Sequence, residues 1–171
     1  MPDNFQIRFA VREDVPVILA FIRALAEYER LSDEVVATEA LLQEWLFEKQ
    51  KAETLIGELD GRPVAFALFF HNFSTFLGRA GVYLEDLYVC PDARGKGIGK
   101  AMLRQVARLA AERGCGRVEW WCLDWNEAGI AFYKSFGAEA MGDWTVYRLA
   151  GDALAAFAAG DVEPARPDAK T

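Results

Sequence analysis

The segment from Tyr83 to Leu103 joins an apolar strand, a glycine-rich loop and an amphipathic helix, and it constrains the fold more than any other part of the chain. Gly95, Gly97 and Gly99 stand where the loop becomes the helix. Glycine lets backbone N–H groups approach an anion closely, and the first N–H groups of a helix have no intrahelical partner. The helix dipole adds partial positive charge at the same end. The segment therefore predicts a pyrophosphate cradle in front of a helix.

Two common phosphate-binding loops do not fit this segment. A Walker A loop requires Gly-Lys-Ser/Thr at a fixed spacing, and that triplet does not follow here. A dinucleotide fingerprint requires Gly-x-Gly-x-x-Gly and an acidic residue after a second strand, and the chain has neither in place. A glycine-rich turn without a ligand is the remaining alternative. The preceding strand, the following helix and Arg94 together favour a phosphate site.

The loop itself has the pattern of a known family. Arg94-Gly-Lys-Gly-Ile-Gly99 follows a strand that ends in Val89-Cys-Pro91. This closely resembles the acetyl-CoA pyrophosphate loop of the GNAT superfamily of N-acyltransferases, whose pattern is Arg/Gln-x-x-Gly-x-Gly/Ala. Arg94, Gly97 and Gly99 fill the three fixed places. The resemblance implies acetyl-CoA as a co-substrate.

Other segments resemble the diamine (spermidine/spermine) N-acetyltransferase branch of this superfamily. They are Leu25–Glu29, Tyr83–Asp86, Trp125–Glu127 and Phe132–Ala138. The branch implies direct transfer of an acetyl group to a primary amine of a small cationic acceptor, which is a polyamine, a diamine or a lysine-like amine. Two alternatives stay open: a protein or peptide amine as the acceptor, and a non-catalytic acyl-CoA sensor.

Periodicity and turn signals predict the order β-α-α-β-β-β-α-β-α-β and a short final helix. This order predicts the α/β class and a GNAT-like acyl-CoA N-acyltransferase fold, with a mixed, mostly antiparallel twisted sheet flanked by helices. One domain is expected over residues 4–159, with a mobile tail over 160–171. The expected strands are 5–9, 55–59, 62–70, 81–90, 117–123 and 144–149, with a loop at 71–78; the expected helices are 12–29, 38–47, 98–113, 126–136 and 152–158.

Acetyl transfer from a thioester to an amine requires the amine to lose a proton and the departing thiolate to gain one. By resemblance, Tyr133 protonates the CoA sulfur; the alternative is an amphipathic core tyrosine. It lies seven residues after Asn126, two helical turns along one face. Glu85 is the predicted base, directly or through a water. Strand alternation places Glu85 and Asp86 on opposite faces, and Asp86 better fits a structural role in a bulge or a dimer contact.

The predicted acetyl-CoA contacts lie in three places. The backbone of the strand end should pair with the pantetheine arm, and the glycine loop should hold the pyrophosphate. By resemblance, an asparagine before the next helix hydrogen-bonds CoA; it could instead only cap its helix, or do both. The residues are Leu87, Tyr88, Val89, Arg94, Gly95, Lys96, Gly97, Ile98, Gly99, Lys100 and Asn126.

The acceptor site is predicted from carboxylates and aromatic rings. Carboxylates bind an ammonium group, and aromatic faces attract it further through cation–π interactions. By resemblance, the residues that line this site are Tyr28, Glu29, Glu85, Asp124 and Trp125, with Asp143 and Trp144 as weaker candidates. A solvated helix end is the alternative for Tyr28 and Glu29.

The charge and composition of the chain exclude several classes of binding partner. The net charge of −7 and the pI of about 4.8 argue against nucleic acid and are compatible with a cationic substrate. No apolar run reaches the roughly 18 residues of a membrane helix, and no secretory signal is visible, so no membrane partner and a cytoplasmic location are expected. His71 is the only histidine and the cysteines lack metal-ligand spacing, so no metal is expected. By resemblance, a homodimer is expected.

Overall fold

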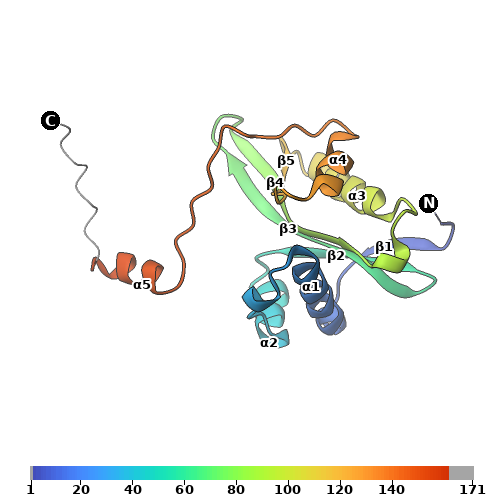
Figure 1. The fold of residues 1–171 in the computed structure, drawn as a ribbon, viewed down its shortest axis with the longest axis horizontal. Helices are drawn as coiled ribbons and strands as arrows, with labels where there is room; N and C mark the ends of the chain where they lie inside the picture. The colour runs from blue at the N-terminus through green and yellow to red at the C-terminus, as the bar shows by residue number, and fades with distance from the viewer. Residues whose placement is uncertain (1, 162–171) are drawn as a thin grey trace. The chain divides into compact units, whose positions relative to one another are not determined.

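The computed structural model describes residues 2–161 of the 171-residue chain. The chain divides between Asn126 and Glu127 into two compact units. The first unit contains the sheet and helices α1 to α3 (Figure 1). The second contains α4 (Glu127–Lys134) and α5 (Gly151–Ala159). The tail predicted over 160–171 lies outside the described residues from 162 onward.

The sheet has five strands that lie side by side in chain order. The first four strands pair antiparallel, and the fifth pairs parallel to the fourth. The expected mixed, mostly antiparallel sheet is therefore confirmed. The strands are β1 (Phe5–Phe9), β2 (Glu53–Leu59), β3 (Arg62–Ser74), β4 (Arg79–Val89) and β5 (Val118–Glu119).

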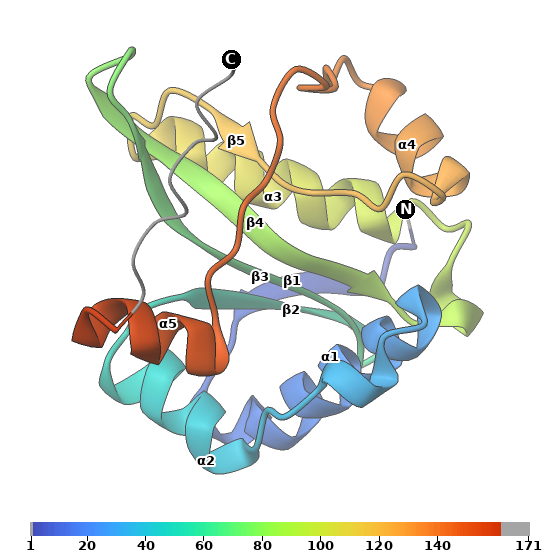
Figure 2. The same ribbon diagram turned by 60° about the vertical axis from the view of Figure 1, so that its left-hand side comes forward.

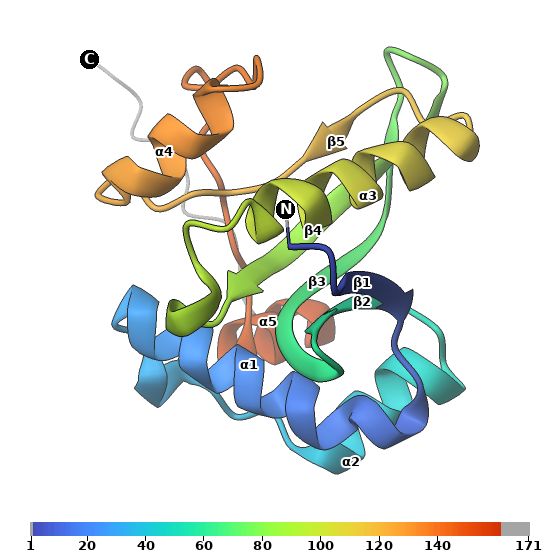
Figure 3. The same cartoon turned by 90° about the vertical axis from the view of Figure 1, so that its right-hand side faces the viewer.

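Helices cover both faces of the sheet in the first unit. Figures 2 and 3 show α3 (Ile98–Glu112) on one face, and α1 (Val15–Glu29) with α2 (Glu39–Leu42) on the other. Thr38 caps α2 as predicted, because its side chain accepts the Leu41 N–H at 3.2 Å. The remaining turns are η1 (Arg12–Asp14), η2 (Ser32–Glu34), the π-helical η3 (Gln43–Glu48) and η4 (Pro91–Ala93).

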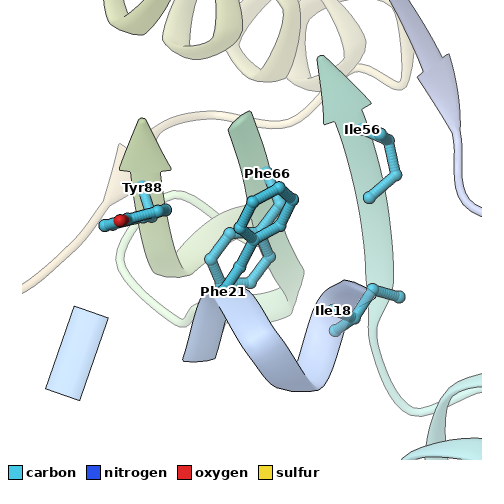
Figure 4. Packing of buried hydrophobic residues seen from close by; sticks show 5 residues of the cluster. All are labelled: Ile18, Phe21, Ile56, Phe66 and Tyr88. Carbon is cyan, nitrogen blue, oxygen red and sulfur yellow. The ribbon is translucent and has the colours of Figure 1, made fainter. Parts of the chain in front are cut away.

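A buried cluster fixes α1 to the sheet. Ile18 and Phe21 of α1 pack on Ile56, Phe66 and Tyr88, which come from β2, β3 and β4 (Figure 4). The Phe21 and Phe66 rings stack with centroids 5.6 Å apart, and Tyr88 packs on Phe21 at 5.7 Å. Since aromatic pairs of this kind bury large apolar areas, the cluster fixes the first half of α1 against the sheet and against Tyr88 near the end of β4.

The loop predicted at 71–78 is wrong. Strand β3 continues to Ser74 and β4 begins at Arg79, which leaves only four residues for the turn. The Ser74 hydroxyl accepts the Leu77 N–H at 3.2 Å and closes this turn. The aromatic and polar composition suggested a loop, but the two strands supply each other with backbone partners along the whole segment.

Two predicted strands are shorter or missing. The strand expected at 117–123 pairs only over Val118–Glu119, and the one expected at 144–149 is irregular in the part of the chain that the structure describes. A strand requires a neighbouring backbone as well as an alternating pattern, and alternation alone cannot supply that neighbour.

Candidate active site

The glycine loop between β4 and α3 has the backbone that the sequence predicted. Gly95 and Gly97 adopt φ of 75° and 80°, a left-handed conformation that disfavours residues with a Cβ. Gly97 is the N-cap of α3 and offers no side-chain cap, and no acidic residue lies in the first turn. The first N–H groups of α3 are therefore left for an external acceptor, which is the arrangement that binds phosphate groups.

Hydrogen bonds and an ion pair from nearby side chains hold this loop in place. Arg62 at the start of β3 forms an ion pair with Asp92 at 2.6 Å, and the Lys96 ammonium donates to the Asp92 carbonyl at 3.0 Å. The Arg94 Nε donates to the Val89 carbonyl at 2.9 Å. These contacts fix the loop relative to the start of β3 and the end of β4.

The pairing of β4 with β5 is short. Within the described residues it joins Val82 to Val118 and Tyr83 to Glu119, and it does not continue along β4 toward Val89. The end of β4 that carries Leu87, Tyr88 and Val89 therefore pairs with β3 on one side only. A backbone edge of this kind can pair with an extended amide-containing ligand.

A β-bulge interrupts β4 at its two neighbouring carboxylates, Glu85 and Asp86. Leu68 stands opposite Asp86, but its neighbour Phe69 stands opposite Leu84, so Glu85 is the extra residue. A bulge therefore lies at the acidic pair, with Glu85 as the extra residue and Asp86 still paired with Leu68. Simple alternation is also interrupted here, so it cannot assign the faces of the two carboxylates.

Cross-strand pairing shows where Asp86 points. Residues opposite each other in adjacent strands share a face, and Leu68 packs against the α1 cluster. Asp86 therefore faces the α1 side, half-buried, while Glu85 is exposed. Burial, together with the charges of Glu85 and Glu29, raises the pKa of Asp86 to about 7. Burial also raises the pKa of Glu29.

These pKa shifts identify a group of interacting carboxylates that was not predicted from the sequence. Asp86 and Glu29 lie close enough for their charges to interact, although they come from β4 and from the end of α1. Burial, Glu29 and Asp124 also raise the pKa of Cys122, so the acidic group extends toward the segment after β5. Two expected acceptor residues, Glu29 and Asp124, are thus brought to one region. Asp86 was missed because a bulge cannot be read from the alternation of a single strand.

The end of α1 carries the aromatic part of the site. The Tyr28 hydroxyl donates to the Asn126 Oδ1 at 3.0 Å, and the Tyr28 and Trp125 rings meet at 6.1 Å. The Arg94 guanidinium lies over the Tyr28 ring, with its Cζ 5.1 Å from the ring centroid. The structure therefore joins residues predicted for the acceptor (Tyr28 and Trp125) to residues predicted for acetyl-CoA (Arg94 and Asn126).

Tyr133 lies on α4 in the second unit and is described within that unit. Its ring is half-buried and makes edge contacts with Phe132 at 5.3 Å and Phe136 at 6.4 Å. Its role as the acid stays a prediction. Asp143 and Trp144 are exposed and lie in an irregular segment of the same unit.

Within residues 2–161, no helix combines the length and the apolar character needed to cross a bilayer. No group of three or more His, Cys, Asp or Glu side chains in the same range is arranged to hold a metal ion.

A glycine loop that opens a helix, beside a β4 edge that β5 leaves unpaired, defines the class of the acyl-CoA N-acyltransferases. The profile of the Acetyltransferase (GNAT) family matches residues 17–138, so the chain belongs to that family and is an acyltransferase. The predicted family and fold are confirmed.

Similar proteins agree with this class. The thialysine N-epsilon-acetyltransferase of Sus scrofa is 39% identical over 161 residues, which cover 86% of this chain and 94% of that protein. The L-ornithine N5-acetyltransferase NATA1 of Arabidopsis thaliana is 32% identical over an alignment of 198 positions that covers 89% of this chain and 87% of the relative. An integron cassette protein of V. cholerae has a similar structure, with a TM-score of 0.76, 25% identity, and coverage of 92% of this chain and 99% of that one.

Proposed function

We propose that the chain transfers an acetyl group from acetyl-CoA to the terminal primary amine of a small cationic acceptor of the lysine or ornithine type. The observation that carries this proposal is the acidic group of Glu29 and Asp86 beside the rings of Tyr28 and Trp125. Carboxylates and aromatic faces together suit an alkylammonium group. Thialysine and ornithine, the acceptors named for two relatives, both carry such an amine at the end of an amino acid side chain.

The acetyl-CoA side of the proposal is supported by the loop and the strand edge. The uncapped N–H groups at the start of α3 suit the pyrophosphate, and Lys96 and Lys100 add positive charge there. The backbone of Leu87 to Val89 suits the amides of the pantetheine arm. The thioester would then lie along β4, on the strand that carries Asp86.

The test is the release of CoA from acetyl-CoA across a panel of amines. The panel contains thialysine, lysine, ornithine, spermidine, a short diamine, an aminoglycoside and a histone-like peptide. A preference for an amino acid with a terminal side-chain amine supports the proposal. A preference for the peptide would select a protein acceptor, and acetyl-CoA binding without turnover on any amine would select the sensor.

A homodimer and a cytoplasmic location belong to the proposal as well. The homodimer is supported by the family resemblance, and the location by the sequence pattern alone. Light scattering of the purified chain measures the first directly, and a mass of one chain (19.1 kDa) would contradict it.

Replacing Gly97 by alanine tests whether the glycine loop binds acetyl-CoA, as distinct from contributing only to folding stability. Alanine at a positive φ costs about 1–2 kcal/mol, and the added Cβ would occupy open space in front of α3. We expect the KM for acetyl-CoA to rise about fivefold because the Cβ and the strained loop both oppose the approach of phosphate.

Gly78→Ala is the matched control for this prediction. Gly78 also has a positive φ, 64°, with nothing near its Cβ position, but it lies in the turn between β3 and β4. Thermal unfolding should show a similar loss in both variants, whereas only Gly97→Ala should alter acetyl-CoA binding. Equal acetyl-CoA affinities in the two variants would contradict a phosphate site at Gly97.

A further inference from the structure

Five side chains from three segments of the first unit form one continuous stack. The Cζ atom of Arg30 lies 5.2 Å from the Trp125 ring centroid, and the Trp125 and Tyr28 rings meet at 6.1 Å. The Arg94 Cζ lies 5.1 Å from the Tyr28 centroid and 5.8 Å from that of Tyr88. The stack therefore runs from the end of α1 through the segment after β5 to the cofactor loop, with Tyr28 at its centre.

The stack leaves Arg94 able to bind an anion. Its guanidinium contacts Tyr28 and Tyr88, and its Nε is used by the Val89 carbonyl. A guanidinium held in this way retains its terminal N–H donors for a phosphate oxygen. Arg94 is otherwise exposed, so the two rings and the one carbonyl restrict a side chain that would sample many rotamers in water.

The hydroxyl of Tyr28 orients a second cofactor residue. It donates to the Asn126 Oδ1 at 3.0 Å, so the amide oxygen is turned toward α1. The NH2 group of the same amide points in a different direction within the amide plane, and it can act only as a donor. Acetyl-CoA offers carbonyl and phosphate oxygens, which need donors.

We propose that Tyr28 is a positioning residue for acetyl-CoA, acting through Arg94 with its ring and through Asn126 with its hydroxyl. This inference rests on the proposed function and deepens it, because the sequence had assigned Tyr28 to the acceptor alone. One side chain then serves both substrates. A change in the Tyr28 ring on binding of the amine therefore alters the affinity for acetyl-CoA. By linkage, acetyl-CoA binding alters the affinity for the amine by the same factor.

The test measures CoA binding by calorimetry and the separate KM values for acetyl-CoA and amine. Tyr28→Phe keeps the ring and loses the hydroxyl, so CoA should bind about fivefold more weakly, the value of one hydrogen bond. Tyr28→Leu loses the ring as well and should weaken CoA binding by about a further threefold to fivefold. In an Asn126→Ser background, which removes the amide oxygen that accepts the Tyr28 hydroxyl, Tyr28→Phe should cause no additional loss of CoA binding.

Tyr147→Phe is the matched control, since Tyr147 is 91% exposed and belongs to no predicted site. It should bind CoA as the unmodified chain does. If the unmodified chain fails to bind CoA, the proposed function itself fails. If it binds CoA and Tyr28→Phe binds equally well, only the role of Tyr28 is overturned. A lower unfolding temperature in Tyr28→Phe with unchanged CoA affinity would likewise overturn it, because that is the result of a purely structural tyrosine.

Discussion

Tyr133→Phe is expected to lower the turnover number at least tenfold while the KM for acetyl-CoA changes less than twofold. A positioned general acid contributes about 10²–10⁴ to a rate, and tenfold is a conservative lower limit for its loss. The phenyl ring keeps the edge contacts that Tyr133 makes with Phe132 and Phe136, so α4 should fold normally. The measurement is the steady-state release of CoA at saturating amine.

Tyr147→Phe again provides the control, because it removes an exposed hydroxyl from the same unit. Its turnover number should equal that of the unmodified chain. Turnover in Tyr133→Phe within twofold of the unmodified value would exclude Tyr133 as the acid and leave it as an amphipathic packing residue of α4.

Asp86→Asn is expected to raise the KM for the amine at least tenfold at pH 8. The variant replaces a carboxylate that faces the end of α1 by a neutral group of the same shape, and a hydrogen bond to a charged partner is worth about 1.5–3 kcal/mol. Since the pKa of Asp86 is raised to about 7, the unmodified chain should also lose amine affinity as the pH falls below 7. That pH dependence should be weaker in Asp86→Asn.

The same substitution should stabilise the fold at high pH. A pKa of about 7 in the folded chain, against 3.8 in the unfolded one, means that the folded state binds more protons between these values. The free energy of unfolding therefore falls as the pH rises from 4 to 7, and the loss is complete above 7. Asp86→Asn should raise the unfolding temperature at pH 8 and leave it unchanged below pH 4.

Glu85→Gln is the comparison that decides between the two neighbouring carboxylates. Glu85 is exposed in the bulge, so its neutralisation should affect stability little. If it nevertheless removes the acidic limb of the pH–rate profile and Asp86→Asn does not, Glu85 is the base, as the sequence predicted. If only Asp86→Asn moves that limb, the half-buried Asp86 has the role.

Local chemistry made much of the fold predictable. Asp60 and Gly61 adopt the positive φ values, 54° and 75°, that an Asp-Gly hairpin turn requires. Gly114, with φ of 69°, follows α3 as predicted, and the cap at Thr38 is in place. These signals depend on a few neighbouring residues. The strand expected at 144–149 depended instead on a distant neighbour, which no local pattern encodes.

The contacts between the predicted site residues could not be predicted from the sequence. Tyr28, Arg94 and Asn126 were each named from sequence, but as residues for different substrates. Their contacts arise because α1 packs on the sheet through the buried cluster, and tertiary packing of that kind leaves no short-range pattern in the sequence. Asp86 was underestimated for a related reason, since its pKa is raised first by tertiary burial and then by the charges of Glu85 and of Glu29, which comes from a separate element.

Because Glu85 is the extra residue of a bulge, β4 can lose this one residue without inverting the side chains on either side of it. A strand that gains one residue normally inverts every side chain beyond the insertion, but the bulge absorbs Glu85 and leaves Leu68 opposite Asp86. A chain shortened by this one residue would keep Asp86 on the α1 side in a regular ladder. In an alignment of related sequences, a single-residue gap at this point would therefore separate those that retain both carboxylates from those that work with Asp86 alone.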